Sequence, residues 1–254
     1  MPSASAVHVT VWGDGDPAVF VHGSLGSGAR TWAAQRPLAE TYRLMLVDRR
    51  GFGASPGPEA GDFEVDARDL LEVMPPHAHL VGHSYGGVAA LVAAAHKPDR
   101  IRSLVVIEPP ALGLVRGHAE VEEFIAGVAR ARAAATDADD YVRRFFTVFG
   151  LAPPSRAAEG AALRAATTSW RERPPWEAEI PLDVLRAATF PKLVVRGQWD
   201  VAPEALGRTV FAAICDVLVR QLEAESATIS GVAHSIPRSG RPLNDVLRAF
   251  WEAA

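Results

Sequence analysis

A serine lies between two glycines in a run of residues that could make its hydroxyl reactive. The pattern G-x-S-x-G spans residues 82–86, with Ser84 at its centre. An apolar run predicted to be a strand precedes it, and a predicted helix follows it. Glycines let the backbone pass close by. A sharp strand-to-helix turn exposes the hydroxyl near helix N–H groups, which favour developing negative charge. The pattern therefore predicts that Ser84 is a nucleophile.

The elements that must position Ser84 alternate between strands and helices. Strands are predicted over residues 7–12, 18–21, 44–47, 78–82, 101–107, 192–196 and 227–230. Helices are predicted over residues 32–41, 63–74, 85–96, 205–223 and 242–251. Such alternation is typical of a parallel sheet with helices on both faces. The glycines of residues 13–15 predict a hairpin turn after the first strand.

The alternation is interrupted between residues 111 and 188. This stretch has helical periodicity, over residues 121–132, 139–149 and 157–170, and no convincing strand. We therefore predict a sheet domain formed by residues 1–110 and 189–254, with residues 111–188 as a helical insertion.

In its strand–turn–helix context, the 82–86 motif resembles that of the α/β-hydrolase superfamily, and the resemblance covers nearly the whole chain. Residues 48–55 are similar to that family's D-x-R-G-x-G-x-S turn, which we expect to be an ordered supporting loop with positive-φ glycines. The resemblance implies an α/β-hydrolase fold: a mostly parallel, doubly wound α/β sheet with a helical cap inserted after the sixth strand.

The same resemblance implies the chain order nucleophile, acid, histidine. His234 follows the last predicted strand, where the family places its base. Two carboxylates are alternatives for the acid that orients this histidine. Asp200 follows strand 192–196, at the usual family position. Glu108 ends strand 101–107, like the strand-end glutamate of zearalenone-type lactonases. Neighbouring strand ends of a parallel sheet lie side by side, so either could reach His234. The other carboxylate is expected to support the site or contact substrate.

The remaining expected site residues surround the nucleophile. The resemblance places the two oxyanion-hole donors on the backbone N–H groups of Tyr85 and Ser24. His22 is expected to shape the loop beside the site. The aromatic residues of the cap expected to form an apolar wall over the cleft are Phe145, Phe146, Phe149, Trp170 and Trp176. The candidate substrate-binding residues are Trp176, Phe146, Trp170 and His22.

Composition narrows the class of protein. The 254 residues are 48% hydrophobic and 22% charged, with a formal net charge of −4, which gives no reason to expect a nucleic-acid partner. The single cysteine, Cys215, cannot form an intrachain disulfide.

The sequence shows no secretory signal, no apolar run of membrane-spanning length and no metal-ligand spacing. We expect a cytoplasmic protein with no cofactor, a small-molecule substrate and no membrane partner. The oligomeric state is left open, a homodimer being one option.

The function expected from these residues is that of a serine hydrolase. It would cleave a carboxylic ester or lactone of a small, largely apolar substrate through an acyl-serine intermediate. Because fold does not fix function, the same residues would also serve a C–C bond hydrolase, a thioesterase, a cofactor-free perhydrolase or a proton-abstracting lyase. A hydrolase-fold ligand receptor is the non-enzymatic alternative.

Overall fold

The computed structural model describes residues 7–57 and 60–254. Within them, one sheet of seven strands has the order β1-β3-β2-β4-β5-β6-β7. The strands are β1 (Val9–Trp12), β2 (Asp16–Val21), β3 (Tyr42–Val47), β4 (Ala78–His83), β5 (Ile101–Ile107), β6 (Lys192–Gly197) and β7 (Glu225–Ile229). The helices are α1 (Gly28–Thr31), α2 (Phe63–Val73), α3 (Tyr85–His96), α4 (Ala119–Ala134), α5 (Ala138–Phe149), α6 (Gly160–Trp170), α7 (Leu182–Ala187), α8 (Leu206–Leu222) and α9 (Arg241–Glu252). The predicted fold class, a mostly parallel α/β sheet with helices on both faces, is confirmed.

The first two strands do not pair with each other, so the predicted hairpin at residues 13–15 was wrong. β3 lies between them: it pairs with β1 in antiparallel fashion and with β2 in parallel fashion. The turn chemistry of residues 13–15 is local, whereas strand pairing depends on residues about thirty positions away. The other strand pairs of the sheet are parallel.

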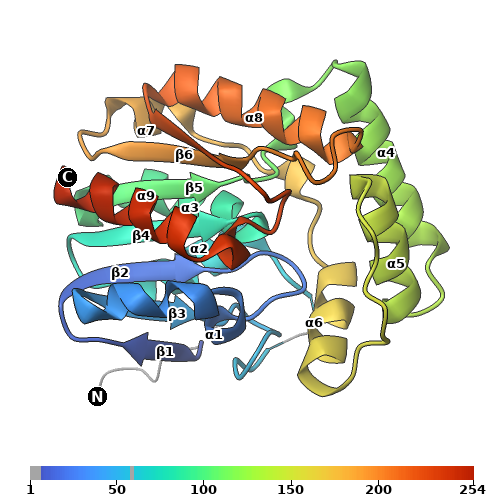
Figure 1. Ribbon diagram of the computed structural model, residues 1–254, viewed down its shortest axis with the longest axis horizontal. Helices are drawn as coiled ribbons and strands as arrows, with labels where there is room; N and C mark the ends of the chain where they lie inside the picture. Colours follow the sequence, from blue (N-terminus) through green and yellow to red (C-terminus); the bar gives the residue numbers. More distant parts are fainter. Residues whose placement is uncertain (1–6, 58–59) are drawn as a thin grey trace.

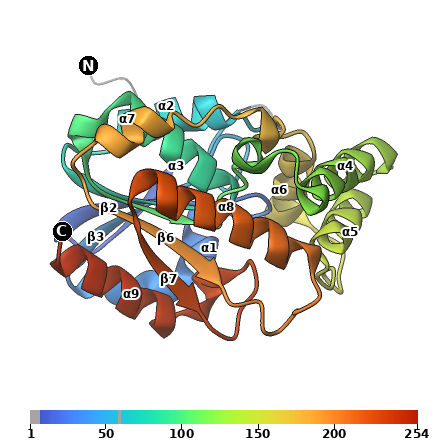
Figure 2. The same ribbon diagram turned by 90° about the horizontal axis from the view of Figure 1, so that it is seen from above.

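Helices cover both faces of the sheet, as Figures 1 and 2 show. Helices α2, α3, α7 and α8 bury one face, and α9 with the 3-10 helix Ala33–Glu40 buries the other. Helix α3 is buried from Tyr85 to Ala94. Its glycines and alanines allow close contact with the strands beneath. Because both faces are covered, the central strands are almost continuously apolar.

Helices α4, α5 and α6 pack on one another beyond the carboxyl ends of the parallel strands (Figure 1). They follow β5, the fifth described strand, so the prediction of an insertion after the sixth strand was wrong. Five β-prone runs precede residue 111, and each forms one strand. The division at residues 110 and 188 stays a prediction. Helix α7, inside the predicted cap, packs on α3 and α8 of the sheet domain.

The register of the central strands sets the ends of β4 and β5 beside each other. His83 at the end of β4 pairs with Ile107 at the end of β5, and Ile107 pairs with Val195 of β6. The next residues keep this pairing: the Ser84 N–H donates to the Ile107 carbonyl at 2.9 Å. The residues that follow the two strands, Ser84 and Glu108, are therefore brought to the same edge of the sheet.

Candidate active site

Ser84 lies on the sharp turn between β4 and α3 with φ 52° and ψ −127°. A positive φ is strained for a residue with a Cβ. The turn is possible because its neighbours are glycines. A Cβ on Gly82 would lie 2.6 Å from the Gly86 carbonyl oxygen, and a Cβ on Gly86 would strike the His22 carbonyl. The backbone thus holds the serine on the turn, where the residue as a whole is 9% exposed.

Three side chains form a hydrogen-bonded chain that begins at this serine. Ser84 Oγ lies 2.8 Å from His234 Nε2, and His234 Nδ1 lies 2.7 Å from Glu108 Oε2. An ionised carboxylate can only accept, so Nδ1 carries the ring hydrogen and Nε2 accepts from the serine hydroxyl. This arrangement poises the imidazole to take the proton of Ser84.

Glu108 is fully buried, and both of its carboxylate oxygens are hydrogen-bonded. Oε1 accepts the backbone N–H of Gly197 at 2.9 Å and the indole N–H of Trp199 at 2.8 Å. Oε2 is left for His234. A buried carboxylate needs such donors to offset the loss of water. Trp199 was not predicted as a site residue from the sequence, because its buried indole and positive φ of 58° are tertiary features.

Asp200 is exposed and hydrogen-bonded to the loop that carries the histidine, not to the histidine itself. Each of its carboxylate oxygens lies 3.0 Å from the Gly231 N–H. The Trp199 N–H donates to the Val232 carbonyl at 3.0 Å in the same loop. Of the two carboxylates that the sequence left open, Glu108 is therefore the one placed on His234, and Asp200 supports the histidine loop.

Aromatic rings surround His234. Phe211 of α8 stacks on it with centroids 4.4 Å apart, and Phe149 of α5 lies at 5.3 Å. The His83 Nε2–H donates to the His234 carbonyl at 2.8 Å. Burial, with a smaller contribution from the neighbouring His234, lowers the pKa of His83 to about 3, so its ring is neutral at neutral pH. Phe211 lies 127 residues after Ser84, and no local pattern singles it out.

The loop after β2 approaches Ser84 closely. A Cβ on Gly23 would lie 2.6 Å from the Ser84 Cβ, so only glycine fits there. The next residue is Ser24, the expected oxyanion donor. The other expected donor, Tyr85, is the first residue of α3, where a backbone N–H has no acceptor within the helix. Both expected donors thus lie beside the serine.

His22 supports this loop from within. Its ring is completely buried, its Nδ1–H donates to the Gly23 carbonyl at 2.7 Å, and its Nε2 accepts from the Arg49 N–H at 3.1 Å. Burial lowers the pKa of His22 well below its usual value, and the nearby Arg49 charge adds to this effect. With both nitrogens bonded to backbone, the ring fits the loop-shaping role better than a substrate contact.

The aromatic candidates of the cap occupy different places. Trp170 donates its indole N–H to the Arg132 carbonyl at 3.0 Å and stacks on Tyr141, which are contacts within the cap. Phe146 packs partly buried against the same small cluster of α5 and α6, and Trp176 packs against the main core. Phe149 contacts His234 directly. Their substrate-binding roles stay predictions.

The loop after β3 has the supporting structure expected from the sequence. Asp48 accepts the N–H groups of Gly28 and Ala54 at 2.6 and 2.9 Å, and Gly51 and Gly53 have positive φ. The next side chain, Arg49, forms buried ion pairs with Asp66 at 2.9 Å and with Glu172 at 2.5 Å. Glu172 was not predicted from the sequence, because its partners lie more than a hundred positions away.

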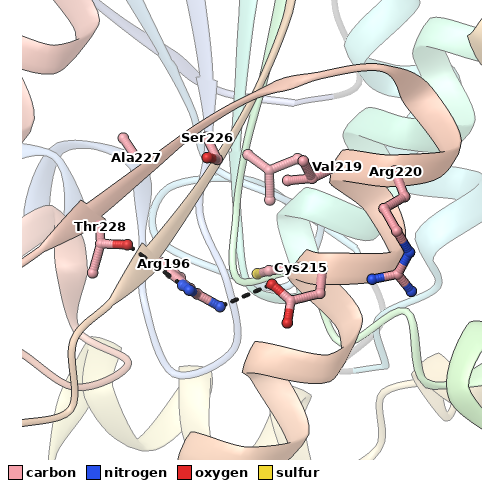
Figure 3. A pocket seen from close by; sticks show the side chains of 9 residues that line it. Arg196, Cys215, Val219, Arg220, Ser226, Ala227 and Thr228 are labelled. Carbon is pink, nitrogen blue, oxygen red and sulfur yellow. Dashed lines mark hydrogen bonds and ion pairs between the residues drawn. The ribbon is translucent and has the colours of Figure 1, made fainter.

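Two cavities lie beside β6 on the α8 side of the molecule. The first, of 160 Å³, lies between β6, β7 and α8, with Arg196 held between Thr228 and Asp216 (Figure 3). The second has a volume of 240 Å³, and Glu108 and Trp199 are among the residues that line it. Neither is lined by Ser84 or His234.

In the described ranges, no group of three histidine, cysteine or acidic side chains could hold a metal ion. Within the same ranges, no helix combines the length and apolarity required to cross a bilayer.

Similar proteins place this fold in a known family. A family model described as the alpha/beta hydrolase fold matches residues 16–228, and the chain belongs to that family. A segment is 38% identical over 104 residues to the pimeloyl-(acyl-carrier protein) methyl ester esterase of Aeromonas salmonicida, covering 40% of this chain and 41% of the esterase. Another is 36% identical over 110 residues to a putative carbamate hydrolase of Variovorax paradoxus, again covering 40% and 41%.

The curated matches therefore span about two fifths of each relative's length. Among solved structures, an esterase from Exiguobacterium antarcticum is similar over 97% of this chain and 95% of its own, with a TM-score of 0.70 and 21% identity. At this identity the likeness shows the fold alone.

Proposed function

We propose that the protein is a serine hydrolase that cleaves a carboxylic ester or lactone of a small, largely apolar substrate. The observation that carries the proposal is the chain Ser84–His234–Glu108, with hydrogen bonds of 2.8 and 2.7 Å. Phe211 and Phe149 around His234 favour an apolar substrate. The esterase and hydrolase names of the relatives support the reaction class.

The first half of the proposed reaction forms an acyl-enzyme. Ser84 Oγ attacks the carbonyl carbon while His234 Nε2 takes the hydroxyl proton, and Glu108 stabilises the resulting imidazolium. The carbonyl oxygen becomes an oxyanion facing the N–H groups of Tyr85 and Ser24. When the tetrahedral intermediate collapses, the alkoxy oxygen leaves with the proton from His234.

The second half regenerates the enzyme. A water molecule gives a proton to His234 and attacks the acyl carbon, and the Ser84–acyl bond breaks as His234 returns the proton to Ser84. An ester yields an acid and an alcohol. A lactone yields a single hydroxy acid, because its alkoxy oxygen stays attached to the acyl group.

Steady-state hydrolysis of short-chain p-nitrophenyl esters and of lactones tests the proposal. We expect multiple turnovers by the wild type and a loss of kcat of about 10³-fold or more in Ser84→Ala. Ser226→Ala, a serine change at the cavity of Figure 3, should keep wild-type rates. Full activity in Ser84→Ala would contradict the proposal. So would the absence of ester and lactone turnover by folded wild type, which would favour thioester, C–C bond or receptor functions.

A further inference from the structure

One segment of the inserted region contacts both residues assigned to the oxyanion hole. This segment, residues 169–173, comprises the end of α6 and the three residues after it. The Ser169 Oγ accepts the Leu25 N–H at 2.8 Å, and the Glu172 Oε2 accepts the Ser24 hydroxyl at 2.5 Å. The Arg173 carbonyl accepts the Tyr85 hydroxyl at 2.9 Å. The segment is thus hydrogen-bonded to both Ser24 and Tyr85.

Glu172 is the charged centre of these contacts. It is 4% exposed, and its second oxygen, Oε1, pairs with the Arg49 Nη2 at 2.5 Å. Arg49 is 1% exposed and comes from the loop after β3, where it also pairs with Asp66 of α2. Its guanidinium lies 4.6 Å from the centre of the Tyr85 ring. A buried carboxylate with two short, charge-assisted partners is held rigidly.

The loop that Glu172 contacts includes a residue with an unfavourable backbone conformation. Ser24 stands between Gly23 and Leu25, and Leu25 has a positive φ of 63°. A non-glycine residue in this conformation persists only where its surroundings impose it. The two bonds from residues 169–173 to Ser24 and Leu25 are such surroundings.

We propose that Glu172 is a positioning residue that couples the inserted segment to the oxyanion hole by fixing Ser24 against Arg49. The inference rests on the proposed acyl-transfer function. Glu172 does not touch the reacting atoms and acts through the Ser24 backbone. Removing its charge is expected to impair the step in which negative charge develops on the carbonyl oxygen, because donors must be correctly placed to stabilise that charge.

The test compares Glu172→Gln, Ser24→Ala and their double variant in ester hydrolysis. We expect kcat to fall about 10–100-fold in Glu172→Gln, with KM changed less than about threefold. Ser24→Ala keeps the backbone N–H but loses the anchoring hydroxyl, so its loss in kcat should resemble that of Glu172→Gln. The double variant should be little worse than either single variant, because both changes weaken the same link between Ser24 and Arg49.

Glu177→Gln is the matched control. Glu177 follows the same segment and also pairs with an arginine, Arg173, at 3.1 Å, but it is exposed. This variant should keep wild-type kcat. Inhibition by a trifluoromethyl ketone separates a role in the oxyanion hole from a purely structural role. The inhibitor adds to Ser84 and forms an oxyanion there, so its affinity depends on how the oxyanion-hole donors are placed. Its inhibition should weaken in Glu172→Gln by about the same factor as kcat.

Three results would overturn the inference. The first is a wild-type kcat in folded Glu172→Gln. The second is unchanged inhibition by the trifluoromethyl ketone. The third is a double variant in which the losses multiply. Ser84→Ala separates this failure from failure of the proposed function: an active Ser84→Ala contradicts the function itself, whereas an inactive Ser84→Ala beside a fully active Glu172→Gln contradicts only the role of Glu172.

Discussion

Two carboxylates at neighbouring strand ends have opposite environments. Glu108 is fully buried, with two N–H donors on one oxygen and His234 on the other. Asp200 is exposed and bonds the backbone of the histidine loop. A fixed carboxylate keeps the histidine in the tautomer that can accept the serine proton. At the scale of single residues, the environment therefore assigns the orienting role in the proposed mechanism to Glu108.

Replacing each carboxylate by its amide tests this assignment. Glu108→Gln should lower kcat by about 10³–10⁴-fold, since the amide no longer fixes the productive tautomer or stabilises the imidazolium. Asp200→Asn should lose less than about tenfold, because its remaining carbonyl oxygen can still accept the Gly231 N–H. Steady-state kinetics on one ester, with melting curves to show folding, is the measurement. Equal and large losses from both variants would indicate a shared carboxylate network.

At the scale of elements, β4 leads into the turn at Ser84 and also carries a buried histidine. His79 is fully buried, its Nδ1 is hydrogen-bonded to the Ser103 Oγ of β5 at 2.7 Å, and its ring stacks on Trp251 of α9. Burial, aided by the charge of Arg102, lowers the pKa of His79 to about 4. The His79 imidazole therefore links β4 to β5 and α9, and its burial favours the neutral form of the ring.

Acidification should destabilise the folded protein through His79, because the folded state binds this proton less tightly than the unfolded chain does. The unfolded chain binds a proton at His79 near its usual pKa of 6.5, and the folded protein binds it only near pH 4. The contribution of the neutral His79 ring to the free energy of unfolding is thus fully present above pH 6.5 and is lost as the pH falls towards 4. Between pH 7 and 4.5 this group should account for a loss of about 2 kcal/mol in the free energy of unfolding.

His79→Phe keeps the ring stack and cannot ionise. Urea unfolding of both proteins at pH 7 and pH 4.5 should show a fall in stability that is smaller in the variant by about 2 kcal/mol. The variant is less stable than wild type at pH 7 if the Ser103 bond matters, so the comparison is between the two pH values within each protein. The same fall in both proteins would contradict the assignment of this pH dependence to His79.

At the scale of the whole molecule, the sequence predicted those features that depend on residues close together in the chain. The alternation of apolar strands and helices and the glycines around Ser84 are local signals, and they predicted the fold class and the nucleophile turn. The pairing of β1 with β3 and the contact of Ser24 with Glu172, 148 positions apart, are not local. The choice between Glu108 and Asp200 also required the structure, because both follow strands that end at the same edge of the sheet.

The central claim is that Ser84 is activated by His234 and Glu108, and covalent labelling tests it most directly. Wild type and Ser84→Ala are exposed to a serine-directed fluorophosphonate, and the intact proteins are weighed by mass spectrometry. The proposed mechanism predicts a single adduct on the wild type, slower labelling of Glu108→Gln and no adduct on Ser84→Ala. A folded wild type that forms no adduct, or an adduct of equal yield on Ser84→Ala, would contradict it.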